Sequence, residues 1–309
     1  MAKPSTFFKQ FAHESAKPDA APERLALFIA GMAYPDLNLE EPLLLLDRMA
    51  QRVAETVIQY SPGMDRAIQF LAIINHEFAF EGNRNSYYDV QNNFLNVVLE
   101  KRTGMPISLS VICMAVGRRL SAYGIDLKID GVGLPRHFMA RYEDEAGVWL
   151  LDPFNGEVIT ENDAGRYLGQ MLYDERWDGT EIALPSEVFR PVSPNMVAFR
   201  MLNNLRIEYL HQENLLSAIR VLDYMLVLQP QDELLWRERA LLHYQCENWE
   251  LAERDIRRFF FLKDSLLVTF THLIEENDHF DELMEDLGEE DHNLLYLLSD
   301  IEKHRTRLN

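Results

Sequence analysis

Gly104-Met105-Pro106-Ile107-Ser108-Leu109 opens a long apolar stretch, and two short segments follow it: Gly133-Leu134-Pro135-Arg136-His137-Phe138 and Leu151-Asp152-Pro153-Phe154. Pro106 suits the first turn of a helix, where its missing N–H leaves no bond unmade. From Ile107 to Leu120 the apolar residues fall on one stripe, which predicts a buried helix. A helix start is therefore followed along the chain by a His and then by an Asp.

The residues on both sides of this stretch predict the fold class. Residues 22–80 repeat apolar residues with the period of a helix, whereas 127–133, 138–142 and 148–151 have the pattern of strands. Residues 143–147 read as the loop of a hairpin. We expect an α+β domain in which a helical half delivers one buried helix onto a small antiparallel sheet.

An internal repeat follows between residues 199 and 264. Ala252 lies 34 positions after Ala218, and the same spacing relates Ile256 to Leu222. Thirty-four residues is the tetratricopeptide period, so the segment predicts an all-α domain of two helical hairpins. Because two repeats bury too little surface to stand alone, we expect them to pack against the first domain or a C-terminal helix.

Four segments are predicted along the chain. Residues 1–21 are rich in Lys, Ser, Pro and Ala, which favours a mobile N-terminus. The α+β domain covers residues 22–190, the repeats cover 191–264, and an acidic helical segment covers 265–309.

Composition narrows the classes of partner. Fifty acidic residues against 30 basic ones give a net charge of -20, which repels nucleic acid and anionic membranes. No apolar run is long enough to cross a membrane, and the N-terminus lacks the apolar core of a signal peptide, so we expect a cytoplasmic protein. Two distant cysteines, Cys113 and Cys246, exclude a disulfide framework. No Gly-rich phosphate loop or metal-ligand spacing is present, so neither a cofactor nor a metal is predicted.

Ser108, His137 and Asp152 are the candidate catalytic residues. A thiolate near a helix N-terminus is stabilised by the exposed N–H groups, but a serine hydroxyl gains less and needs a base. His137 could act as that base and Asp152 could orient its imidazole. Alternatively, Ser108 is only the N-cap of the helix. Cys113 is a rival nucleophile, but its place on the apolar stripe predicts a buried, unreactive thiol.

The chain resembles the SirB-type family, in which a transglutaminase-like core precedes tetratricopeptide repeats. The resemblance covers roughly residues 60–262, and four segments carry most of it: Asn83-Arg84-Asn85-Ser86-Tyr87-Tyr88-Asp89, the stretch from Val98 to Leu109, Gly131-Val132-Gly133-Leu134-Pro135-Arg136-His137-Phe138 and Asp152-Pro153-Phe154-Asn155-Gly156. It implies a fold like that of papain and the transglutaminases. Ser108 then stands where active relatives hold the catalytic Cys, with Ser110 as the alternative if the alignment slips, and His137 and Asp152 match their His and Asp.

Two functions follow as hypotheses. In the first, the core is degenerate, and the protein is a non-catalytic, regulatory interaction module whose repeats form a groove for a protein or peptide. In the second, it is a hydrolase or acyltransferase in which Ser108 attacks an amide or ester, His137 is the base, and helix amides stabilise the oxyanion.

Overall fold

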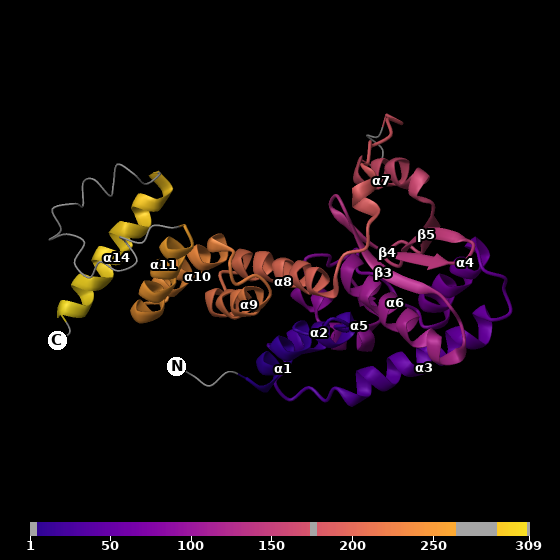
Figure 1. Ribbon diagram of the computed structural model, residues 1–309, viewed down its shortest axis with the longest axis horizontal. Coiled ribbons are helices and arrows are strands. Elements are labelled where there is room, and N and C mark those ends of the chain that lie inside the picture. Colours follow the sequence, from indigo (N-terminus) through magenta and orange to yellow (C-terminus); the bar gives the residue numbers. More distant parts are fainter. Residues whose placement is uncertain (1–4, 174–177, 264–288, 308–309) are drawn as a thin grey trace. The chain divides into compact units, whose positions relative to one another are not determined.

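The computed structural model describes residues 5–173, 178–263 and 289–307, and the chain divides into two compact units, Met1–Glu208 and Tyr209–Asn309 (Figure 1). The first unit mixes helices with a small antiparallel sheet, and the second is helical within the described residues. The predicted α+β domain followed by an all-α domain is confirmed.

Helix α6 (Pro106–Leu120) is the central element of the first unit and begins at the predicted proline. All of its residues up to Gly117 are buried, because the sheet covers one side while α2 (Pro22–Ala30) and α3 (Glu40–Val57) cover another (Figure 1). A helix that is apolar nearly all round is typical of such a fully enclosed position.

The main sheet has four antiparallel strands in chain order: β3 (Lys128–Leu134), β4 (His137–Asp144), β5 (Gly147–Asp152) and β6 (Glu157–Ile159). The first three match the predicted strands and the predicted hairpin loop. The structure adds the short β6 and a separate parallel pair, β1 (Glu81–Gly82) and β2 (Thr103–Gly104). Strands of two or three residues carry too little alternation to be recognised in the sequence.

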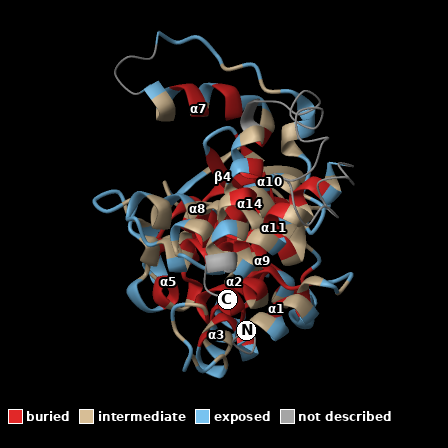
Figure 2. Cartoon of the chain, turned by 90° about the vertical axis from the view of Figure 1, so that its left-hand side faces the viewer, coloured by how far each residue is buried: buried red, intermediate tan, exposed pale blue. Residues whose placement is uncertain are grey.

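Both faces of the sheet are covered. Ile129 packs against Gly117 of α6, where a Cβ would lie only 2.7 Å from the Ile129 side chain. Val132, three residues along β3, points to the opposite face and joins a cluster with Ala164 and Leu168 of α7 (Ala164–Tyr173). Buried residues alternate with exposed ones along α7 in Figure 2, as expected for a helix with one face on a sheet.

The N-terminus differs from the prediction of a mobile segment over residues 1–21. Thr6–Ser15 forms helix α1, in which Phe7 and Phe11 are buried. The Phe7 ring lies so close to Gly31 that a Cβ there would be 2.2 Å away. Two phenylalanines supply enough apolar surface to hold this helix against α2, a contribution that the Lys- and Pro-rich composition conceals.

Shorter elements complete the first unit. They are helix α4 (Met64–Ala72), the π-helix η1 (Ile73–Glu77), η2 (Val90–Asn93), α5 (Leu95–Lys101), η3 (Ser121–Tyr123), η4 (Glu161–Asp163), η6 (Ser186–Phe189) and α8 (Pro194–His211).

Helix α8 shows that the first unit extends beyond the predicted end of the α+β domain at residue 190. The first unit runs to Glu208. Val197 of α8 lies against Gly131 of β3, and the Arg200 guanidinium stacks on the Phe138 ring of β4. Most of the first repeat helix therefore belongs to the first unit, and two of its residues contact the sheet.

The second unit contains α9 (Leu215–Leu228), α10 (Glu233–Gln245), α11 (Trp249–Leu262) and α14 (Glu289–Arg307). The 34-residue repeat is present in the backbone, since Glu213 and Glu247 both adopt left-handed φ values, 55° and 58°. The equivalent Ala218 and Ala252 are both fully buried. The predicted repeat is confirmed.

A C-terminal helix covers the repeats. Phe259 and Phe260 of α11 share one buried cluster with Leu294, Leu295 and Leu298 of α14. This is one of the two arrangements expected for a pair of repeats. Of the predicted acidic segment 265–309, residues 265–288 lie outside the described residues, and 289–307 are helical.

Candidate functional site

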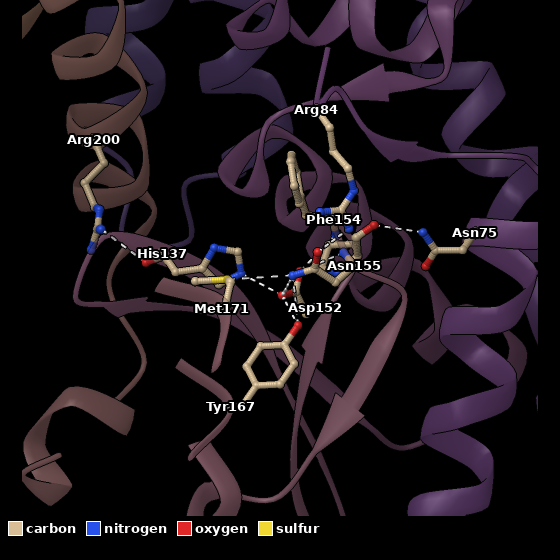
Figure 3. Close-up of polar contacts among 10 residues, drawn as sticks. Asn75, Arg84, His137, Asp152, Phe154, Asn155, Tyr167, Met171 and Arg200 are labelled. Carbon is tan, nitrogen blue, oxygen red and sulfur yellow. Dashed lines mark hydrogen bonds and ion pairs between the residues drawn. The ribbon is translucent and has the colours of Figure 1, made fainter. Parts of the chain in front are cut away.

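Asp152, the last residue of β5, accepts hydrogen bonds from five donors (Figure 3). Its Oδ2 lies 2.7 Å from His137 Nε2, 2.6 Å from the Tyr167 hydroxyl and 2.8 Å from Asn155 Nδ2. Its Oδ1 accepts from the backbone N–H groups of Phe154 at 2.9 Å and Asn155 at 3.2 Å. The side chain is completely buried. Every lone-pair direction of the carboxylate is thus used inside the protein.

These donors keep Asp152 ionised. Burial by itself would raise the pKa of the Asp152 carboxyl. The hydrogen bond and charge of His137, with the bonds from Tyr167 and Asn155, outweigh burial and lower that pKa below the ordinary value of an aspartate. Because an ionised carboxylate can only accept, the hydrogen at Nε2 belongs to the imidazole. The Nδ1 atom of His137 makes no hydrogen bond to any described residue, so it is the ring nitrogen available to a ligand.

The local sequence explains how the site forms. His137 begins β4 and Asp152 ends β5, and the pairing of Ala140 with Leu151 brings these two strand ends together. After Asp152 the chain turns at once, with the Gly156 N–H donating to the Asp152 carbonyl at 2.8 Å and Gly156 at a φ of 78°. Glycine adopts this left-handed conformation without strain. The turn begins at Asp152 itself and places the N–H groups of Phe154 and Asn155 against the Asp152 carboxylate.

Ser108 lies in the first turn of α6, as predicted, but its side chain is fully buried. Its Oγ accepts from the Met105 N–H at 3.1 Å and donates to the Met105 carbonyl at 3.0 Å. Met105 is the N-cap residue, and Ser108 supports it from three residues inside the helix. Within the described residues, the Ser108 hydroxyl forms no hydrogen bond with His137. The structure thus joins His137 to Asp152. The N-cap is Met105 and not Ser108 as the alternative expected, and the Ser108 hydroxyl bonds the Met105 backbone from the third helical position.

The two rival nucleophiles are also buried. Ser110 is fully buried, and its Oγ has no hydrogen-bond partner among the described residues. Cys113 is fully buried, and burial, together with the negative charge of Asp152, raises the pKa of its thiol well above the ordinary value. A thiol that stays protonated is a poor nucleophile.

Two polar residues that the sequence did not single out hold the loop after Asp152. Asn75 lies in the π-helix η1 and donates from Nδ2 to the carbonyls of Phe80 at 2.7 Å and Pro153 at 2.8 Å (Figure 3). π-helices are rare and occur frequently at functional sites. Arg84 stacks on the Phe154 ring at 5.2 Å and bonds the Asn155 side chain. Arg84 and Asn155 both lie in segments that resemble the SirB-type family. That resemblance is the one sequence signal that could have marked them as site residues.

His137 opens onto a pocket of about 160 Å³, called here the His137 pocket. Ser108 is not among its lining residues, which are Tyr87, Met105, Pro106, Ile107, Arg136, His137, Phe138, Arg200 and Asn204. Two further hollows, of about 450 and 660 Å³, are both lined by Arg84 and Asn155. His137 thus borders a pocket that Ser108 does not line.

Metal-ligand clusters and membrane-length apolar helices are absent from the described parts of the chain. Within residues 5–173, 178–263 and 289–307, no group of three or more His, Cys, Asp or Glu residues is placed to hold a metal ion. In the same ranges, no helix combines the length and the apolar character that crossing a bilayer requires.

Comparison with known proteins agrees with this architecture. A model of the transglutaminase-like superfamily matches residues 41–203, and a tetratricopeptide-repeat model matches residues 205–266. The fold and these matches define a transglutaminase-like domain followed by tetratricopeptide repeats.

The relatives refine this class. The chain is 32% identical over 244 residues to a UPF0162 protein of Xylella fastidiosa, covering 76% of this chain and 81% of that protein. It is 28% identical over 221 residues to Protein SirB1 of Salmonella typhimurium, covering 69% of this chain and 76% of SirB1. No solved structure matches the chain significantly. The chain belongs to the transglutaminase-like, SirB-type family, as its sequence segments predict.

Proposed function

We propose that this protein is a non-catalytic interaction module, in which the transglutaminase-like domain has lost its nucleophile and the repeats bind a protein or peptide partner. The observation that carries the proposal is the state of Ser108. Its hydroxyl is buried and donates to and accepts from the Met105 backbone. To attack a substrate, the hydroxyl would have to break both bonds and become exposed. The buried Met105 N–H would then be unpaired, at a cost of about 1–3 kcal/mol, whereas the Met105 carbonyl would keep its bond from the Leu109 N–H at 3.1 Å.

The second unit supports the interaction part of the proposal. Tetratricopeptide repeats are in general protein-interaction modules. Two large apolar side chains are left exposed on consecutive helices, Leu216 on α9 and Leu234 on α10, each 61% exposed. Exposed leucines on a repeat surface are suited to contact an apolar partner side chain.

A second candidate function, a hydrolase or acyltransferase with Ser108 as nucleophile, is favoured by one specific observation. The His137 and Asp152 pair is intact and held at 2.7 Å by a fully satisfied carboxylate. An oriented imidazole with a free Nδ1 is what a general base requires.

A labelling experiment separates the two functions. The full chain is treated with a fluorophosphonate probe, and the modified residue is identified by mass spectrometry in wild type and in the Ser108→Ala and His137→Gln variants. The proposal expects no labelling of Ser108 above that of the equally buried Ser110. Labelling of Ser108 that disappears in the His137→Gln variant would establish the hydrolase instead.

A binding experiment tests the interaction role directly. Partner capture by the full chain is quantified for wild type and for the Ser108→Ala, Leu234→Glu and Leu44→Glu variants. Leu44 is 57% exposed on α3 in the first unit and serves as the matched control. We expect Leu234→Glu to lose the captured partner while the other two variants retain it. Equal capture by all variants would contradict a role for the repeat surface.

A further inference from the structure

Arg200 of α8 brings an uncompensated positive charge to the His137 pocket. Its guanidinium stacks on the Phe138 ring at 5.2 Å, and its Nη2 lies 3.5 Å from the His137 carbonyl (Figure 3). The side chain is half-buried, yet no carboxylate of the described residues forms an ion pair with it. Arginines in such positions are normally paired, because removing an unpaired charge from water is costly.

The fold makes room for this guanidinium. A Cβ at position 133 would lie 1.8 Å from Arg200 Nη1, so the guanidinium takes the space that a side chain on β3 would fill. Burial lowers the pKa of Arg200, because removal from water disfavours the charged form. An anion in the pocket would compensate that charge.

The rest of the pocket has the same sign. Arg136 is a second cation in its wall, in the turn between β3 and β4 at a left-handed φ of 58°. The first turn of α6 contributes Ile107, and the positive end of a helix dipole favours an anion nearby. No Asp or Glu lines the pocket, although the chain carries 50 of them. In a protein of net charge -20, this pocket wall carries two arginines and no acidic residue.

We propose that the His137 pocket binds the C-terminal carboxylate of a peptide through Arg200 and Arg136. The planar fork of an arginine matches a carboxylate with two parallel hydrogen bonds. The remaining wall includes Met105, Ile107 and Phe138, which offer apolar surface to a terminal side chain. An inorganic anion would leave this apolar wall uncovered. A volume of about 160 Å³ limits the occupant to a chain end with a small to medium side chain.

This site extends the proposed binding role, on which it rests, to a defined chemical group. The ligand would lie beside the free Nδ1 of His137, a nitrogen that can donate to a carboxylate when protonated. In this role His137, oriented by Asp152, contributes to binding the carboxylate. The intact pair then has a function that does not require a nucleophile.

The test compares two probes on the full chain. N-acetyl-Ala-Leu as the free acid and the same dipeptide as its C-terminal amide are titrated while the backbone amide signals of His137 and Phe138 are followed by NMR. We expect the free acid to bind at least about tenfold more tightly than the amide, since one charge-assisted bidentate pair is lost in the amide. Inorganic phosphate is titrated as a third probe.

Three variants complete the test. Arg200→Gln and Arg136→Gln should each abolish most of the preference for the acid, whereas Arg190→Gln, an exposed arginine outside the pocket, should leave it unchanged. Because Arg136 is exposed, its replacement by Gln should not disturb folding. Arg136→Gln therefore tests the carboxylate site even if Arg200→Gln fails to fold. Equal binding of acid and amide, absence of binding by both, or binding of phosphate as tight as the acid would overturn the proposal. Loss of partner capture in Leu234→Glu together with no acid preference would leave the interaction role standing and remove only this site.

Discussion

Replacing Asp152 by Asn tests how much the hydrogen bonds that converge on this buried carboxylate stabilise the first unit. Asn has the same shape and keeps one acceptor oxygen, so the Oδ1 bonds from Phe154 and Asn155 can persist. The Oδ2 position then becomes an amide NH2 group, which donates hydrogen bonds and cannot accept them. His137, Tyr167 and Asn155 then lose their shared acceptor.

The expected cost follows from these three bonds. A hydrogen bond to a charged group contributes about 1.5–3 kcal/mol, and a neutral one contributes about 1 kcal/mol. Weakening three such bonds to the fully buried Oδ2 therefore lowers the free energy of unfolding of the first unit by about 3 kcal/mol.

Hydrogen exchange read by mass spectrometry measures this loss locally. Peptides covering β4 and β5 report the opening of the sheet separately from the second unit, so the two units do not have to unfold together. A loss of about 3 kcal/mol corresponds to roughly 150-fold faster exchange in these peptides.

The control is Asp163→Asn, an exposed carboxylate whose side chain accepts from the Thr160 hydroxyl. We expect it to change exchange by less than about 0.5 kcal/mol, which is typical of a surface substitution. Equally fast exchange in the Asp152 and Asp163 variants would show that the hydrogen bonds to Asp152 do not stabilise the sheet.

Three further predictions concern the Asp152 carboxylate, the two cysteines and Gly82. Because folding lowers the pKa of Asp152, the ionised carboxylate contributes its full stabilisation of the folded state above pH about 4, and this contribution is lost as the pH falls through the folded pKa. Urea titrations at several pH values should therefore show that the free energy of unfolding falls more steeply in acid for wild type than for Asp152→Asn. In the native protein, iodoacetamide should modify the half-buried Cys246 and leave the buried Cys113 untouched, as peptide mapping would show, and rapid modification of Cys113 would contradict its burial. Gly82→Ala should cost about 1–3 kcal/mol in thermal unfolding, because a Cβ would lie 2.5 Å from the Phe154 ring, and Phe154→Leu in the same chain should relieve part of this cost.

Much of the fold could be predicted because its signals are local. Pro106 and the apolar residues after it predict α6, and alternation predicts β3, β4 and β5 within one or two residues at each end. The N-terminal helix α1 was missed because two phenylalanines decide it, within a segment whose composition favours disorder. The association of most of α8 with the first unit was missed because the repeat period says nothing about which neighbour a helix packs on.

The site was predicted in part. Its order along the chain indicated that His137 and Asp152 could meet, and the pairing of β4 with β5 brings them to 2.7 Å. Tyr167 had no signal, because it reaches Asp152 from α7 on another part of the chain. Asn75 depends on a π-helix, which has no recognisable pattern in a single sequence.

The sequence by itself determined the elements and their order: a proline-started helix, the strands that carry His137 and Asp152, and a 34-residue repeat. It did so because period, proline and turn chemistry act within a few residues of the chain. Only the tertiary structure decided where the side chains go. Ser108 turns to the Met105 backbone instead of the imidazole, and Arg200 reaches the His137 pocket across 63 residues of chain. Both outcomes depend on which polar groups are buried away from water and must find partners inside the protein. That set of groups is defined only after the helices have packed on the sheet.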